Sequence, residues 1–209
     1  MQKKKKLSNL GYLVAAVIAL IFLAVTVIMV LIEPFEPYNF GLRFTGLWGY
    51  LFMAVAAIKI PFVKGIKLHF GQSFLRLHYI YSYTGMALTA IHAVMPAVRF
   101  SDITVLAPDF SSWSAFWDLA GGETAFIIMI IAFIGVILKP KIKWWRPIHV
   151  LMYPMLILSL VHATIMGTTF VNLAVLVIFY VLFALVILSF VLQRIKSLRK
   201  NAKRQKKSQ

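Results

Sequence analysis

The sequence predicts an all-α membrane protein, a bundle of six transmembrane helices with both chain ends on the same side of the membrane. Three observations predict this class. The chain has 209 residues, of which 61% are hydrophobic, and its mean hydropathy is +0.87. The apolar residues gather in several runs of about 20, which soluble domains of this size do not carry. Basic residues gather in every second connection between these runs and acidic residues gather in the others, as they do on the two sides of a membrane.

Each apolar segment is bounded by basic, proline-containing or polar residues. The first follows MQKKKK, and its length of roughly 20 residues is that of a spanning helix rather than a signal peptide. We therefore expect it to be a retained helix. The six expected spans are about Leu10–Ile32, Phe44–Ile60, Phe74–Val98, Ala125–Leu138, His149–Met166 and Val171–Leu192.

The domain organisation follows from these spans. Residues 1–9 form a basic N-terminal segment, residues 10–193 form one membrane domain, and residues 194–209 form a basic tail that we expect to be disordered beyond its first turns. The longest connection, Arg99–Thr124, contains two tryptophans at helical spacing, which predicts a short amphipathic interfacial helix.

The charged residues predict the orientation. In a six-span topology, 20 of the 22 Lys and Arg residues fall on the side that holds both chain ends, whereas Arg43, Arg99 and all six acidic residues fall on the other. The positive-inside rule makes the basic side cytoplasmic, so we expect a multi-pass protein of the cytoplasmic membrane. Basic segments next to spans are explained by topology and by membrane lipid, and no nucleic-acid partner is expected.

Four of the five histidines lie in the third and fifth spans. His78 and His92 are fourteen residues apart, and His149 and His162 are thirteen apart, so each pair covers roughly 20 Å of helix. Both spans run outward, so each offers one inner and one outer histidine. Intramembrane histidines can bond to neighbouring helices, but ionisable residues within spans are functional candidates. Facing histidines at two depths are what stacked bis-histidine haems need.

The absence of cysteine limits the kinds of cofactor that the chain can bind. Thiolate-ligated clusters and covalent haem attachment both need cysteine, and the chain has none. Any haem is therefore b-type. On an ideal helix, a fourteen-residue spacing returns to within about 40° of the same face, but a thirteen-residue spacing misses by about 140°. Pro154, between His149 and His162, can kink that helix.

The segments LRLHYIYSYTGMALTAIHAV and RPIHVLMYPMLILSLVH, preceded by TGLWGYLFMAVAAIKIPF, resemble the ferric reductase-like transmembrane family. That family includes the membrane portions of NADPH oxidases and ferric reductases. The resemblance covers about residues 10–193. It implies a transmembrane cytochrome with two haem b groups, held by His78 with His149 at the inner side and by His92 with His162 at the outer side. It also implies outward electron transfer.

The chain departs from the larger members of that family. Only the basic tail follows Leu192, and no G-x-G-x-x-G fingerprint occurs, so we expect no flavin or NAD(P) site. The electron donor is then a separate cytosolic flavoprotein or a membrane quinol. The acceptor is external: ferric iron, oxygen or a partner reductase.

Three alternatives remain open. Short members of the family include the haem subunit of a periplasmic methionine sulfoxide reductase, which this chain resembles in size. A haem-sensing membrane protein would use the same histidines without passing electrons. A transporter would use them as a proton relay, although no acidic residue lies inside an expected span.

The remaining candidates are less specific. His69 is expected in a surface loop. Arg76 and Arg146 flank the inner histidines, where they can pair with haem propionates or anchor the helices at the interface. Arg43 and Arg99, the two bases on the acidic side, can contact a propionate or an anionic substrate, or extend to the interface as lipid-facing arginines do.

Overall fold

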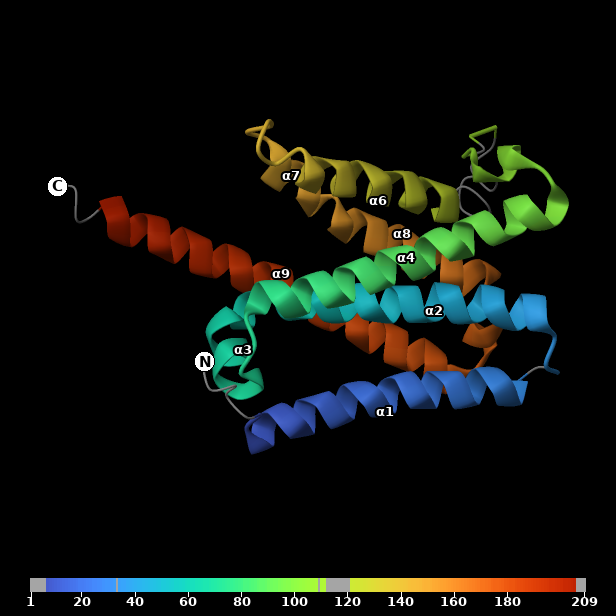
Figure 1. The fold of residues 1–209 in the computed structure, drawn as a ribbon, viewed down its shortest axis with the longest axis horizontal. Coiled ribbons are helices and arrows are strands. Elements are labelled where there is room, and N and C mark those ends of the chain that lie inside the picture. The colour runs from blue at the N-terminus through green and yellow to red at the C-terminus, as the bar shows by residue number, and fades with distance from the viewer. Residues whose placement is uncertain (1–6, 33, 109, 112–120, 206–209) are drawn as a thin grey trace, which may run out of the picture.

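The computed structural model describes residues 7–32, 34–108, 110–111 and 121–205, and it contains helices and no strand within these ranges. The all-α class is therefore confirmed for the described residues (Figure 1). The elements are α1 Asn9–Ile32, α2 Pro37–Ile58, η1 Ile60–Phe62, α3 Val63–Phe70, α4 Phe74–Phe100, η2 Ile103–Leu106, α6 Gly121–Ile137, α7 Trp145–Val150, α8 Met152–Met166, η4 Thr168–Val171 and α9 Leu173–Gln205.

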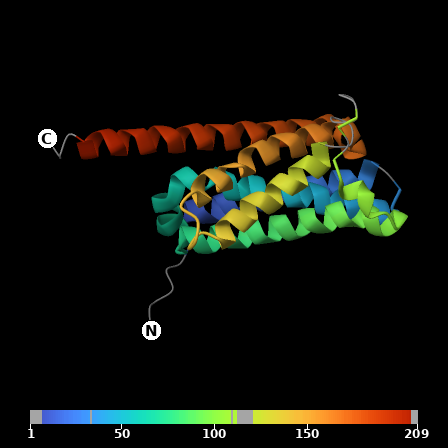
Figure 2. The ribbon, with the colours of Figure 1, turned by 90° about the horizontal axis from the view of Figure 1, so that it is seen from above.

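The long helices run lengthwise, and the start of α1 and the end of α9 lie at the same end of the molecule (Figures 1 and 2). That end also holds α3, the start of α4 and the connection from α6 to α7. These segments carry most of the basic residues, so we call it the basic end. The opposite end holds the start of α2, the end of α4 and the start of α6. We call it the acidic end, because the described acidic residues Glu36, Asp102 and Glu123 lie in or next to these parts of the chain.

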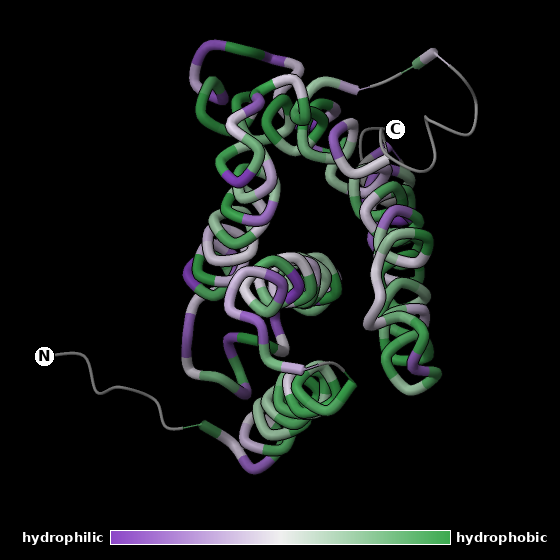
Figure 3. Tube along the Cα trace, turned by 90° about the vertical axis from the view of Figure 1, so that its right-hand side faces the viewer, coloured by the Kyte–Doolittle hydropathy of each residue, from purple (hydrophilic) through white to green (hydrophobic). Residues whose placement is uncertain are grey.

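Helix α2 forms the centre of the packing. Its buried residues include Leu47, Tyr50, Leu51 and Ala54, and they join one apolar core with residues of α1, α8 and α9. Helix α1, by contrast, leaves large apolar side chains exposed, for example Leu20 at 62%. The hydropathy colouring of Figure 3 shows hydrophobic residues around the long helices as well as between them. Apolar side chains exposed all along a helix are those expected to face lipid.

Helices α2 and α4 approach each other closely at two glycines. A Cβ atom on Gly85 would lie 2.7 Å from Cγ of Met53, and one on Gly49 would lie 2.6 Å from Oγ1 of Thr89. Small residues allow helices in a membrane to pack backbone against backbone. This contact fixes the position of α4, and with it the positions of His78 and His92.

Four helical segments are long and apolar enough to cross a membrane: Asn9–Ile32, Pro37–Ile58, Trp145–Met166 and Leu173–Ala202. The shorter apolar helix α6 has 17 residues. Helix α4, with 27 residues, is not among the four, because its two histidines, arginines and hydroxyl side chains lower its hydropathy. Four of the six expected spans therefore have the length and composition of a membrane helix.

Helix α2 starts earlier than expected, and its connection to α4 is helical. Glu36 caps α2 by accepting a hydrogen bond of 2.6 Å from the Asn39 amide, and Pro37 occupies the first turn, where proline is favoured. The connection that follows contains η1 and α3, ends at Gly71 with φ 63°, and leads to the cap Ser73, which accepts from the Arg76 amide. The expectation that His69 lies in a surface loop is therefore wrong, because His69 lies in α3.

We expected disorder beyond the first turns of the tail, but α9 continues to Gln205, so this expectation is wrong for the part of the tail between those turns and Gln205. The fifth span is broken at Leu151, which separates α7 from α8. Pro154 explains the break, since its ring cannot donate to the Val150 carbonyl and clashes with it. The interfacial helix expected between Arg99 and Thr124 falls mainly on residues 112–120, which lie outside the described residues.

Candidate functional site

At the basic end, α4 and α7 bring His78 and His149 together. Their imidazole centroids lie 6.3 Å apart, and the ring planes are nearly perpendicular at 87°. Metal–imidazole nitrogen bonds are about 2.0 Å long, so two rings on opposite sides of one metal have centroids about 6 Å apart. The separation of 6.3 Å is therefore that of two imidazoles able to share one metal.

The second ring nitrogens of this pair lie in different surroundings. Nδ1 of His149 is buried and has no hydrogen-bond partner among the described residues, whereas the His78 ring lies close to the backbone of Ala56. A buried polar atom without a partner is costly and calls for an explanation, such as a bound group. Iron bound at Nε2 would not pair with this Nδ1 atom, so the case for the inner pair rests on the ring separation.

Toward the acidic end, α4 and α8 place His92 and His162 near each other, close enough to interact electrostatically. Nδ1 of His92 donates a hydrogen bond of 2.9 Å to the carbonyl oxygen of Leu42 on α2. This bond fixes the tautomer and leaves Nε2 as the nitrogen with a free lone pair, the usual arrangement of a metal-binding histidine. Nδ1 of His162 is buried without a partner among the described residues.

Two glycines make room for the outer pair. A Cβ atom on Gly46 would lie 2.9 Å from Nδ1 of His92, and one on Gly122 would lie 2.8 Å from Cε1 of His162. Both distances are shorter than real Cβ contacts. The sequence analysis missed these residues, although both occur in glycine-containing apolar helices, a pattern that marks close approach.

Lys59 is a second residue that the sequence analysis missed. It directly follows α2, its Nζ atom is buried without a hydrogen bond among the described residues, and it interacts electrostatically with His78. A buried cation beside the inner histidine pair would be stabilised by an anionic partner.

The other candidates have local roles. His69 accepts the Ser8 amide on its carbonyl oxygen, and its Nδ1 lies 2.9 Å from Oγ of Ser8, so it ties the start of α1 to α3. Arg76 donates to Gln72, and Arg146 lies over the Trp145 ring. These are contacts of residues at the protein surface and at the membrane interface. None of them places His69, Arg76 or Arg146 in either histidine pair.

Within the described residues, no group of three or more His, Cys, Asp or Glu side chains could hold a metal ion. Two facing histidines are nevertheless a complete protein ligand set for a haem iron, because the porphyrin supplies the remaining ligands. The chemistry of the donor set therefore fits a haem.

The fold shows the class of the protein. Its described residues form helices, and four of these helices are long and apolar enough to span a membrane. Comparison of the chain with protein-family models, curated proteins and solved structures finds no match. The resemblance to the ferric reductase-like family thus rests on the motifs quoted above.

Proposed function

We propose that this protein is a six-span, b-type di-haem cytochrome of the cytoplasmic membrane that relays electrons outward, as a component of an oxidoreductase system. The observation that carries the proposal is the meeting of four histidines from α4, α7 and α8 in two pairs at different depths. The ring separation of 6.3 Å between His78 and His149 supports it directly.

The chain would contribute ligands and their orientation. His78 and His149 would hold the inner haem iron, and His92 and His162 the outer one. When bound, the haems would supply one-electron redox chemistry. With two histidines and the porphyrin as ligands, an iron would have no open coordination site, so neither haem would bind oxygen or substrate at the metal. The Leu42 carbonyl would hold the His92 ring in a ligating tautomer.

The break at Leu151 supports the pairing. It falls between His149 and His162, so their thirteen-residue spacing does not run along one ideal helix. The two residues can thus face the same neighbour, α4, although an ideal helix would point them about 140° apart. This supports α4 and the α7–α8 segment as the two ligand-bearing spans of the six.

The charge distribution supports the direction and the kind of partner. The basic end would face the cytoplasm, where it would attract an acidic flavoprotein donor at rates that fall with salt; a membrane quinol is the other donor. The acceptor at the acidic end would be ferric iron, oxygen or a partner extracytoplasmic reductase, of which the methionine sulfoxide reductase system is one case.

An optical spectrum and a pyridine haemochrome assay of the purified protein test the proposal. We expect low-spin b-haem bands after dithionite reduction and two haems per chain. Protein without haem would contradict the proposal and favour a proton-relay transporter. NADPH alone should leave the haems oxidised, and NADPH with a flavoprotein reductase, or a quinol, should reduce them. Haems that no donor of either class reduces would instead favour a sensor.

A further inference from the structure

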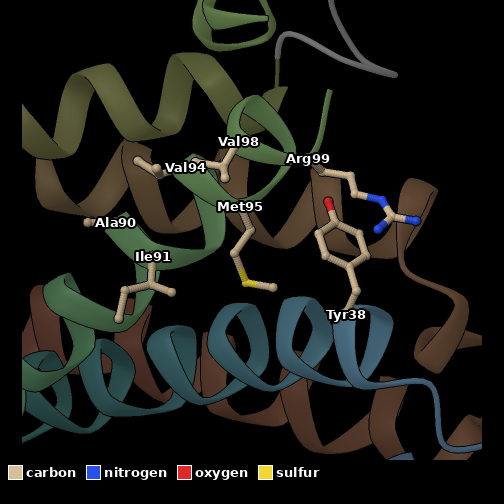
Figure 4. A pocket seen from close by; sticks show the side chains of 7 residues that line it. All are labelled: Tyr38, Ala90, Ile91, Val94, Met95, Val98 and Arg99. Atoms are coloured by element: carbon tan, nitrogen blue, oxygen red, sulfur yellow. The ribbon is translucent and has the colours of Figure 1, made fainter. Parts of the chain in front are cut away.

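A groove of about 590 Å³ lies along α4 at the acidic end (Figure 4). Its walls are apolar side chains of α4, and its mouth is formed by Arg99 with Tyr38 from α2. The α4 residues that line it are Ala90, Ile91, Val94, Met95, Val98 and Arg99. Several of the apolar ones are exposed, Ile91 at 50% and Val98 at 72%.

Arg99 gives this groove a cationic end. Its guanidinium carbon lies 5.1 Å from the centroid of the Tyr38 ring, and Figure 4 shows Tyr38 rising from α2 toward it. No carboxylate pairs with Arg99 among the described residues. Asp102 is the acidic residue nearest to Arg99 along the sequence. Its carboxylate instead accepts hydrogen bonds of 2.6 and 2.8 Å from the hydroxyl and amide of Thr104, and these bonds lower its pKa.

The other base of the acidic end is already engaged. Arg43 donates from Nε to the Asn39 carbonyl at 3.3 Å and from Nη1 to the Met29 carbonyl at 3.5 Å. Arg99 is exposed in the last turn of α4, where that helix reaches the level of the headgroups. An arginine fork that meets no carboxylate in the described part of the chain can bind a phosphate group, whose geometry it matches.

We infer that this groove binds an anionic phospholipid, with its phosphate on Arg99 and an acyl chain along the apolar face formed by Ile91, Val94 and Val98. The apolar lining fits a hydrocarbon chain, and the single cation at its mouth fits a negatively charged headgroup. The inference does not depend on haem binding, so it can stand or fail separately from the proposed function.

Native mass spectrometry of the full-length protein in mild detergent, titrated with phosphatidylglycerol or phosphatidylcholine, tests the site. We expect phosphatidylglycerol to be retained in preference to phosphatidylcholine, and R99Q to weaken its retention at least about tenfold, as loss of a charged hydrogen-bonded contact does. R43Q is the matched control and should retain the lipid as wild type does. V94W, at an exposed position, should block the groove and reduce retention with the charge intact.

Three results would overturn the inference. Equal retention of the two lipids by wild type would show that the headgroup charge is not recognised. Equal losses in R99Q and R43Q would show a general effect of charge at the acidic end. Displacement of phosphatidylglycerol by a quinone that R99Q binds as well as wild type would assign the groove to a neutral ligand.

Discussion

The ammonium nitrogen of Lys59 lies 3.3 Å from the centroid of the Tyr81 ring, at the basic end of the helix bundle. Lys59 follows α2, whereas Tyr81 lies on α4, one turn after His78. The aromatic face stabilises the cation without neutralising it. A positive charge is thereby held beside the inner histidine pair, where haem propionates would provide the missing anionic partner.

We predict that K59M lowers the midpoint potential of the inner haem by on the order of 50 mV, equivalent to about tenfold in a one-electron equilibrium. Reduction adds a negative charge, and removal of a nearby positive charge makes it less favourable. Redox titration of the purified protein measures the shift. K67M, which removes an exposed lysine of α3, should leave both potentials unchanged. Equal shifts in the two variants would show that only overall charge matters.

We predict that single histidine substitutions divide into two groups. H78A and H149A should lose the inner haem, and H92A and H162A the outer haem, each with a fall from two haems to one per chain in the pyridine haemochrome assay. H69A is the control and should keep both, because His69 bonds to Ser8 and belongs to neither pair. A wild-type ratio of one, or haem loss in H69A alone, would contradict the proposed pairing.

The helices and the depths of the histidines could be predicted because they depend on local signals. Apolar runs of spanning length, basic flanks and the spacing between His78 and His92 can all be read along one segment. The break at Leu151 was partly foreseeable, since Pro154 weakens the helix one turn after it. The end of α9 was not foreseen, although the stretch from Arg194 to Gln205 contains no glycine or proline that would stop a helix.

The contacts around the site could not be predicted because they depend on how separate helices meet. The sequence offers no sign that the Leu42 carbonyl faces His92, or that Gly122 lies against His162. In the sequence, Lys59 is not distinguished from the other basic residues between the second and third expected spans. Only the packing of α2 against α4 places it over Tyr81 and beside His78.

We predict that the two ends of the bundle lie on opposite sides of the membrane. The chain has no cysteine, so single cysteines can be introduced at exposed positions without background. On intact cells, an impermeant maleimide should label A107C, which follows η2 at the acidic end, and should not label S197C in the basic part of α9. After permeabilisation, both should react. Labelling of S197C alone on intact cells would reverse the proposed direction of electron flow.

We predict that G46A and G122A disturb the outer haem and spare the inner one. The new methyl group would lie 2.9 Å from Nδ1 of His92 in the first variant and 2.8 Å from Cε1 of His162 in the second. An imidazole can rotate away from a methyl group, but a ring that must also hold a metal cannot do so without straining or losing that bond. The expected result is a shifted or missing low-spin signal from one haem, measured by electron paramagnetic resonance together with haem content.

G65A provides the matched control for these two variants. It also places a methyl group near a histidine, but at an ordinary contact distance of 3.9 Å from Cδ2 of His69. Both haem signals should therefore remain as in wild type. If G46A and G122A also kept both signals while remaining folded, the rings of His92 and His162 would be free to move, and their assignment as ligands of the outer haem would be wrong.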